Sequence, residues 1–126
     1  MKILGVEHVQ LAMPPAAEDT ARSFYAGVLG MCERPKPEHL AKRCGVWFEH
    51  ADVKIHLGVE ADFRPARKAH PAFLVDDLKE LVNTCKKAGH DVIKDEPLAG
   101  YERIYVFDPF GNRLEFLEQA ASQTEG

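Results

Sequence analysis

The chain contains one succession of residue patterns twice, in two stretches that follow each other with a period of about 60 residues. His8 and His70 stand at matching places in two alternating segments. His56 and Glu115 stand at matching places in two later alternating segments. A repeat of this length in 126 residues allows two copies of one unit, with a loop difference of about three residues.

The first copy reads as a strand, a helix and further strands. Residues 5–13 alternate between apolar and polar side chains, which is typical of a half-buried strand. Residues 17–28 carry apolar side chains at helical spacing, and Gly30 follows as a helix end. Segments 46–49 and 53–60 again predict strands.

The second copy repeats this order. Asp76 or Asp77 can cap its helix, which ends at Gly89, and Asp108–Gly111 has the residues of a tight turn between the last two strands. The five predicted elements are 70–75, 78–88, 92–93, 101–107 and 112–118.

These patterns predict an α+β fold with two βαβββ modules in one structural domain. Residues 1–60 form the first module, and residues 61–126 contain a linker over 61–69 and the second module, with an unassigned tail at about 119–126. A single module leaves one face of its sheet bare. We therefore expect the modules to form a curved mixed sheet around a cleft, with the helices outside.

Composition excludes several classes of protein. The net charge of -4 lacks the basic excess that nucleic-acid binding needs, so no nucleic-acid partner is expected. No apolar run approaches the ~18 residues of a membrane span, and the polar residues Glu7 and His8 come too early for a signal peptide. Three cysteines without CxxC spacing indicate reduced thiols. We expect a cytoplasmic protein without a membrane partner.

Four polar residues stand at the matching places of the two copies, on strand faces opposite the apolar ones. They are His8, His56, His70 and Glu115. Nitrogen and oxygen ligands of this kind suit a divalent transition metal. Ordinary surface histidines are the alternative, but one cleft could collect all four side chains.

Two motifs resemble those of a known superfamily. Phe24–Met31, FYAGVLGM, is similar to the FYxxxLGM helix end of the vicinal oxygen chelate superfamily. Asp108–Phe116, DPFGNRLEF, resembles its DPxGNxxEF hairpin. The superfamily includes glyoxalase I, fosfomycin resistance transferases, extradiol dioxygenases and bleomycin resistance proteins, and its motifs do not choose among these activities.

The resemblance implies a metal site. His8, His70 and Glu115 match the three ligands of the superfamily, which would hold one divalent ion of zinc, nickel, manganese or iron. His56 stands where glyoxalase I has a glutamate that also moves protons, so we expect it to be a fourth ligand or a base. Glu115 and His56 are the candidate catalytic residues. The histidine at position 56 departs from glyoxalase I and puts that specific activity in doubt.

Three further residues are candidates for substrate binding. Gln10 shares the face of His8, and Tyr101 and Arg103 could form a lid over the cleft. A solvated strand face and an ordinary hairpin surface are the alternative readings. Trp47, the only tryptophan, is expected in core or interface packing.

The favoured function is a glyoxalase-like, metal-dependent lyase or isomerase acting on a small carbonyl or thiol-adduct substrate by Lewis-acid and proton-transfer chemistry. The alternatives are a metal-free protein that sequesters a small molecule, an iron(II) extradiol dioxygenase and a thiol transferase. A homodimer is expected, because a chain of this length gains apolar burial by pairing.

Overall fold

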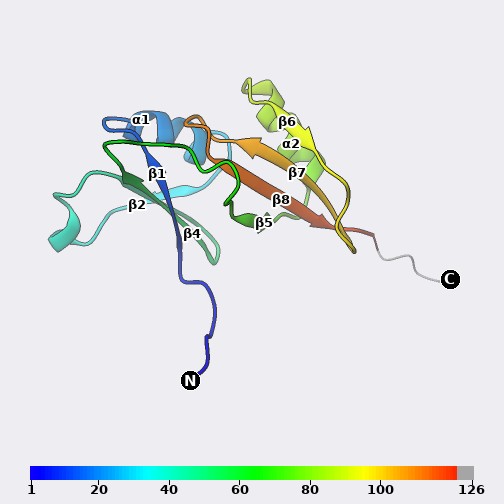
Figure 1. The fold of residues 1–126 in the computed structure, drawn as a ribbon, viewed down its shortest axis with the longest axis horizontal. Helices are drawn as coiled ribbons and strands as arrows, with labels where there is room; N and C mark the ends of the chain where they lie inside the picture. Colours follow the sequence, from blue (N-terminus) through cyan, green and yellow to red (C-terminus); the bar gives the residue numbers. More distant parts are fainter. Residues whose placement is uncertain (122–126) are drawn as a thin grey trace. The chain divides into compact units, whose positions relative to one another are not determined.

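The computed structural model describes residues 1–121, which form two compact units. The first unit is Met1–Pro65, and the second begins at Ala66. Each unit has its own four-stranded mixed sheet (Figure 1). The α+β class and the two βαβββ modules are confirmed.

The first unit consists of β1 (Val9–Met13), α1 (Glu18–Ala21), the π-helical turn η1 (Arg22–Ala26), β2 (Cys32–Arg34), the 3-10 turn η2 (Glu38–Leu40), β3 (Val46–His50) and β4 (Val53–Val59). The sheet order is β1-β4-β3-β2, with β1 parallel to β4 and the other pairs antiparallel. Strand β2 was not predicted, because its three residues are all exposed and show no apolar alternation.

Strand alternation sorts the side chains of this sheet onto two faces. Ile55 and Leu57 of β4 are 1% exposed, and Phe48 of β3 is fully buried. On the same side, Tyr25 of η1 stacks on Phe48 with ring centroids 5.5 Å apart. This is the core of the unit, so the intervening positions, including His56, belong to the face away from the helix.

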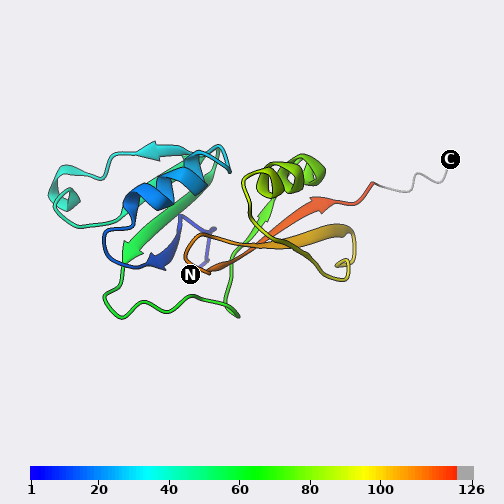
Figure 2. The same ribbon diagram turned by 90° about the horizontal axis from the view of Figure 1, so that it is seen from above.

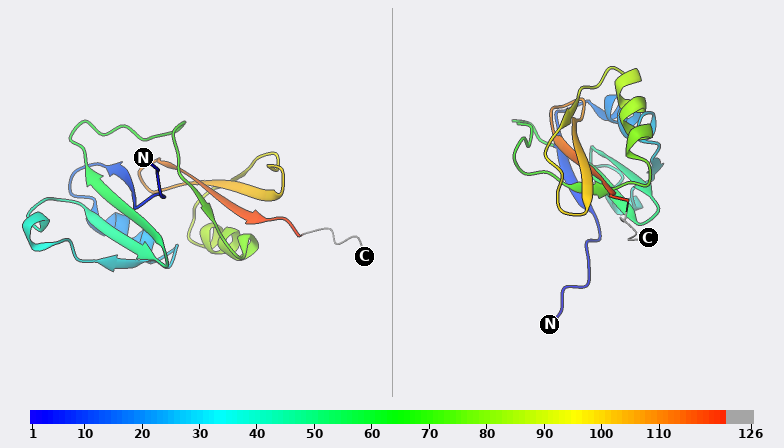
Figure 3. Two further views of the ribbon diagram at one scale, coloured as in Figure 1. Left: turned by 90° about the horizontal axis from the view of Figure 1, so that it is seen from below. Right: turned by 90° about the vertical axis from the view of Figure 1, so that its right-hand side faces the viewer.

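The first strand is shorter than predicted. It begins at Val9 instead of Gly5, so His8 precedes the strand. The parallel register pairs Val9 with Ile55, which places residues before Glu7 beyond the start of β4 at Val53. Without a partner strand in the unit, this segment leaves the sheet as an extended arm (Figure 3).

The second unit contains β5 (Ala72–Leu74), α2 (Leu78–Lys87), β6 (Val92–Lys94), β7 (Tyr101–Phe107) and β8 (Arg113–Gln119). Its sheet order, β5-β8-β7-β6, repeats that of the first unit, and β5 is parallel to β8. Figure 2 shows α2 on one side of the strands β7 and β8. Asp77 caps α2 by accepting the Glu80 N–H, and Gly89 follows the helix with a φ of +87°.

Most element boundaries in this unit differ by one or two residues from those predicted, and two of these differences concern a site residue or the tail. His70 lies before β5, which starts only at Ala72, because Pro71 has no N–H to donate to the ladder; the Pro71 carbonyl still accepts the Glu115 N–H. Gln119 ends β8 instead of starting the tail, and residues 122–126 of the predicted tail lie outside the described residues.

The Asp108–Asn112 hairpin explains one of the two motifs. The Asp108 carboxylate accepts hydrogen bonds from the backbone N–H groups of Phe110 and Asn112 and from the Asn112 amide. Asn112 Oδ1 in turn accepts the Ala66 N–H at 3.0 Å. The motif therefore fixes both the turn into β8 and the segment that leads to His70.

Within residues 1–121 no helix is long and apolar enough to cross a membrane.

Candidate functional site

Three polar and aromatic side chains lie in one row across the first sheet, on the face away from its helix. The register places Gln10 of β1 and Trp47 of β3 on either side of His56 of β4. His56 is only 8% exposed, although it lies outside the apolar core. Aromatic neighbours must therefore cover it.

His56 is sandwiched between two rings. Trp47 stacks on it with centroids 4.0 Å apart and an angle of 4°, and His8 stacks on it at 4.2 Å and 17°. Burial lowers the pKa of His56 below its ordinary value of 6.5, and the charge of His8 lowers it further. The ring is therefore neutral at pH 7 and can accept a proton or bind a metal.

His8 is exposed and tied to its neighbour. Its Nδ1 lies 3.0 Å from the Glu7 carboxylate, which also accepts a hydrogen bond from Lys54 at 2.6 Å. The hydrogen bond from Lys54, followed by that from His8, lowers the pKa of Glu7. Because a metal binds in the plane of an imidazole ring, the nearly parallel rings of His8 and His56 cannot both bind one ion unless one ring turns. His8, which lies outside the strand, is the one free to turn.

Gln10 lies on the same face beside a glycine. A Cβ atom at Gly58 would come within 2.6 Å of Gln10 Nε2, so the amide of Gln10 occupies the space that a side chain at position 58 would fill. These two residues, with Ala12 and Glu60, line a depression of about 230 Å³. The amide is therefore placed at an opening where it can contact a small molecule.

In the second unit the structure brings His70 and Glu115 together. His70 Nε2 lies 2.8 Å from Glu115 Oε1, and Glu115 is only 5% exposed. His70 Nδ1 lies 2.7 Å from the Lys68 carbonyl, which can only accept a hydrogen bond, so Nδ1 carries a proton. This tautomer directs the Nε2 lone pair of a neutral ring at the carboxylate. Two electron-rich atoms, His70 Nε2 and Glu115 Oε1, therefore face each other. Either a further proton lies between them or a cation binds there.

Arg103 supports the same carboxylate. Its Nη1 lies 3.4 Å from Glu115 Oε2 and donates to the hydroxyl of Tyr105 at 3.0 Å. A second ion pair, to Asp95 at 3.4 Å, holds the other side of the guanidinium. Tyr101, also predicted to bind substrate, pairs with Gln119 at the start of β7, four residues from Tyr105.

The predicted ligands thus form two described pairs, His8 with His56 and His70 with Glu115. Between residues 1 and 121, no three His, Cys, Asp or Glu side chains are gathered in a group that could hold a metal ion. The donor set of the second pair fits a divalent cation, because its nitrogen and oxygen converge and its tautomer is fixed.

Sequence reasoning missed three residues of these faces. Trp47 covers His56 instead of packing in the core, and Tyr105 and Arg113 adjoin Glu115. Strand alternation could have identified the last two, since Tyr105 shares a face with Arg103 and Arg113 shares a face with Glu115. Nothing in the sequence shows that Trp47 and His56 stack.

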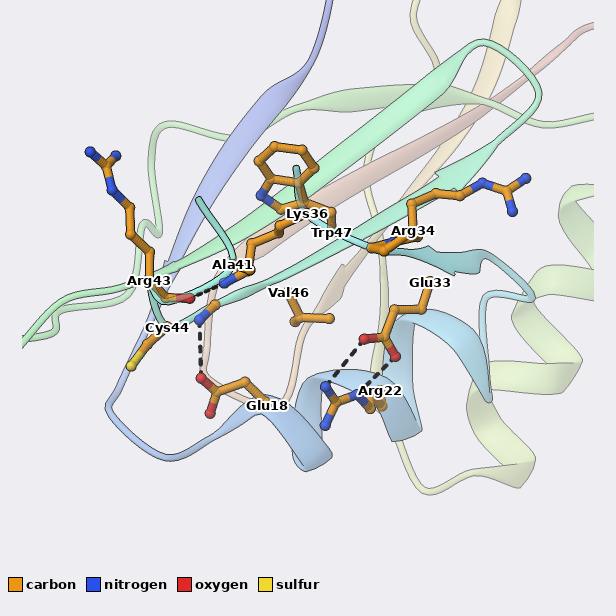
Figure 4. A pocket seen from close by; sticks show the side chains of 12 residues that line it. Glu18, Arg22, Glu33, Arg34, Lys36, Ala41, Arg43, Cys44, Val46 and Trp47 are labelled. Carbon is orange, nitrogen blue, oxygen red and sulfur yellow. Dashed lines mark hydrogen bonds and ion pairs between the residues drawn. The ribbon is translucent and has the colours of Figure 1, made fainter. Parts of the chain in front are cut away.

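A larger pocket of about 290 Å³ lies elsewhere in the first unit, between the start of α1 and strands β2 and β3 (Figure 4). It contains none of the predicted site residues. Its acidic groups are already occupied, because Glu33 pairs with Arg22 at 2.8 Å and Glu18 accepts the Gly45 N–H at 3.0 Å.

Comparisons with known proteins agree with this fold. The family model for the Glyoxalase/Bleomycin resistance protein/Dioxygenase superfamily matches residues 6–116. A Bacillus anthracis protein assigned to the glyoxalase family has a crystal structure with a TM-score of 0.90 and 48% identity, covering 94% of this chain and 98% of that one. No curated protein matches the chain in sequence.

More distant structures share the fold alone. A glyoxalase/dioxygenase from Nostoc punctiforme has a TM-score of 0.73 at 18% identity, covering 96% of this chain and 99% of that one. The fosfomycin resistance protein FosX from Mesorhizobium loti has a TM-score of 0.68, also at 18% identity, covering 94% and 95% of the two chains.

Proposed function

Because the chain belongs to the glyoxalase/bleomycin resistance protein/dioxygenase superfamily, we propose that it is a glyoxalase-like, metal-dependent enzyme acting on a small carbonyl compound or a thiol adduct. The observation that carries the proposal is the His70–Glu115 contact. A buried carboxylate faces an imidazole nitrogen whose tautomer is fixed by the Lys68 carbonyl. A protein that only sequesters an apolar molecule has no need of this buried polar pair.

The proposed ion is divalent zinc, nickel, manganese or iron, and His70 and Glu115 of the second unit would be two of its ligands. When bound, it supplies a Lewis acid that stabilises negative charge on two neighbouring substrate oxygens. His56 of the first unit, neutral at pH 7, is the proposed base. Its protection by Trp47 keeps water from the ring and so favours the neutral form.

The remaining side chains orient the reactants. Arg103 holds Oε2 of Glu115, so this carboxylate keeps one direction while it binds the ion or moves a proton. Gln10, Tyr101 and Arg103 are the proposed substrate contacts. We also propose a cytoplasmic location, because Cys32 and Cys44 are exposed free thiols, which persist in a reducing compartment.

Metal content tests the proposal directly. Protein purified without an affinity tag or chelator should contain about one equivalent of a divalent ion, or take it up after addition. Glu115→Gln should weaken metal binding at least tenfold. The matched control is His39→Gln, which removes an exposed imidazole and should leave metal binding unchanged. Wild-type protein that holds no ion and accepts none would refute the metal-dependent function.

The reaction class needs separate assays. Protein loaded with nickel, zinc, manganese or iron(II) should be given a hemithioacetal, a catechol with oxygen, and an epoxide with a thiol. We expect isomerisation of the hemithioacetal or a related carbonyl adduct. Oxygen uptake with catechol and iron alone would instead identify a dioxygenase, and thiol addition to the epoxide a thiol transferase. Ligand binding without turnover under any metal would identify a sequestering protein.

A further inference from the structure

Arg113 carries donors that the rest of the described chain does not use. Its guanidinium carbon lies 3.8 Å from the centroid of the Tyr105 ring, so the planar group is held against the aromatic face. Its Nε is the one buried side-chain nitrogen or oxygen of residues 1–121 that has no hydrogen-bond partner. Its Nη1 makes only a long contact, 3.4 Å, with the Arg67 carbonyl. A buried donor without an acceptor is costly, so the position favours a ligand that supplies one.

Arg103, on the neighbouring strand β7, differs from Arg113 because its donors have partners. Its Nε donates to the Glu96 carbonyl at 2.8 Å, and its terminal nitrogens contact Tyr105, Asp95 and Glu115. Its charge is therefore matched by two carboxylates. No ion pair is described for Arg113, although its charge contributes, after the Glu96 N–H and Arg103, to lowering the pKa of Asp95.

Arg113 lies close to the candidate site of the second unit. Arg113 and Glu115 are two residues apart on β8 and point to the same face of the sheet. Tyr105, the ring beneath Arg113, pairs directly with Glu115. An anion bound by Arg113 would thus lie one residue pair from the carboxylate that contacts His70.

We infer that Arg113, stacked on Tyr105, is the recognition residue for a carboxylate of the substrate, which makes the substrate an anionic small carbonyl compound or an anionic thiol adduct. This inference rests on the proposed function for the identity of the neighbouring reactive groups. One guanidinium without an ion-pair partner can balance one negative charge, and its planar fork can donate hydrogen bonds to both oxygens of a carboxylate. A phosphate dianion would need a second free cation.

The experiment compares two probes that share a keto group and differ in whether the neighbouring carboxyl group is charged. Phenylglyoxylate carries a carboxylate beside its keto group, and its methyl ester carries none. Binding to metal-free protein is measured by calorimetry, and the Arg113 Nε–H is followed by NMR. We expect the acid to bind at least tenfold more tightly than the ester and to shift the Nε–H signal, because the buried donor gains a charged acceptor.

Variants assign the effect to this side chain. Arg113→Gln should weaken binding of the acid at least tenfold, and Arg113→Lys, which keeps the charge but loses the fork, should weaken it several-fold. Arg64→Gln removes the same charge from an exposed position and should leave binding unchanged. If Arg113→Gln fails to fold, as judged by thermal unfolding, Arg113→Lys decides the question.

Glu115→Gln separates this inference from the proposed function. It should lose metal affinity but keep binding of phenylglyoxylate, because removal of a neighbouring negative charge does not weaken an anion site. Absence of metal binding in the wild type would refute the proposed function while leaving the anion site intact. Equal affinity for acid and ester, unchanged affinity in Arg113→Gln, or tighter binding of inorganic phosphate than of phenylglyoxylate would each overturn the assignment of a carboxylate site.

Discussion

The environment of His56 makes a residue-scale pH dependence measurable. Trp47 is the only tryptophan and stacks on this ring, so its fluorescence reports protonation of His56. Because burial and His8 lower the pKa of His56, quenching by the imidazolium should appear only below pH 6.5. The unfolded chain, with an ordinary histidine, binds the proton more tightly. The free energy of unfolding should therefore fall as the pH drops below about 6.5.

Two histidine variants test whether His56 causes this change in fluorescence with pH. All titrations are measured with a chelator present. His56→Gln should abolish the fluorescence change, and His8→Gln should move its midpoint upward, because one source of the pKa shift is gone. His50→Gln, at the exposed last position of β3, should behave as the wild type. A midpoint above 6.5 in the wild type would contradict the stacked, buried ring.

We expect a small substitution at Gly45 to cause a large loss of stability. Its φ is +112°, and an added Cβ would lie 2.5 Å from the Leu57 backbone oxygen, which cannot move aside within the sheet. Gly45→Ala should lower the free energy of unfolding by about 3 kcal/mol. The matched variant is Gly89→Ala, with a φ of +87° but no atom within 4 Å of the added Cβ, and it should cost about 1 kcal/mol. Chemical denaturation measures both, and equal losses would contradict the steric clash.

At the scale of elements, the hairpin before β8 holds the segment that carries His70. Asn112 is 1% exposed and joins Asp108 to Ala66 through its amide. Asn112→Ala should lower the free energy of unfolding by about 2 kcal/mol, because it leaves buried partners unsatisfied. It should also increase protease cleavage between residues 66 and 70. Asn83→Ala, exposed on α2, is the control, and a similar loss there would refute the special role of Asn112.

The elements differ in how far the sequence reveals them. Strand β7 lies where alternation predicts it, at Tyr101–Phe107, because β8 pairs with it along its whole length and β6 pairs with residues 104–106 on the other side. The start of β1 could not be predicted, because the alternating pattern begins at Gly5 whereas backbone pairing with β4 begins only at Val9. Strand β2 is a paired edge without a buried face, so it lacks the apolar pattern by which a strand is recognised.

At the scale of the whole molecule, the repeat predicts which faces carry the site residues but not their contacts. The sequence period places His56 and Glu115 at matching strand positions, and the structure finds both almost fully buried. Their surroundings nevertheless differ, since aromatic rings cover His56 and charged groups surround Glu115. Divergence of two copies changes side chains while the backbone pattern remains, so sequence periodicity alone cannot show these partners.

The N-terminal arm leads to a prediction about assembly. Ile3, Leu4 and Val6 are 89%, 93% and 79% exposed and follow one another closely in the sequence before β1. Figure 1 shows the N-terminal segment extending away from β1. Full burial of each such side chain is worth roughly 1.5–3 kcal/mol, so an arm of this kind favours association with a second copy. Strand β1 lies at the edge of its sheet, where the backbone of a second chain can add. We therefore expect a homodimer of about twice 14.1 kDa in analytical ultracentrifugation.

Substitutions in the arm test this expectation. The triple variant Ile3→Ser, Leu4→Ser and Val6→Ser should shift the equilibrium toward monomer by at least tenfold in dissociation constant, because three apolar side chains no longer gain by leaving water. Leu98→Ser changes a 43% exposed leucine in the loop before β7 and should leave the constant unchanged. A wild-type chain that stays monomeric at all concentrations would contradict the dimer. A triple variant that pairs as tightly as the wild type would show that the dimer forms through another surface.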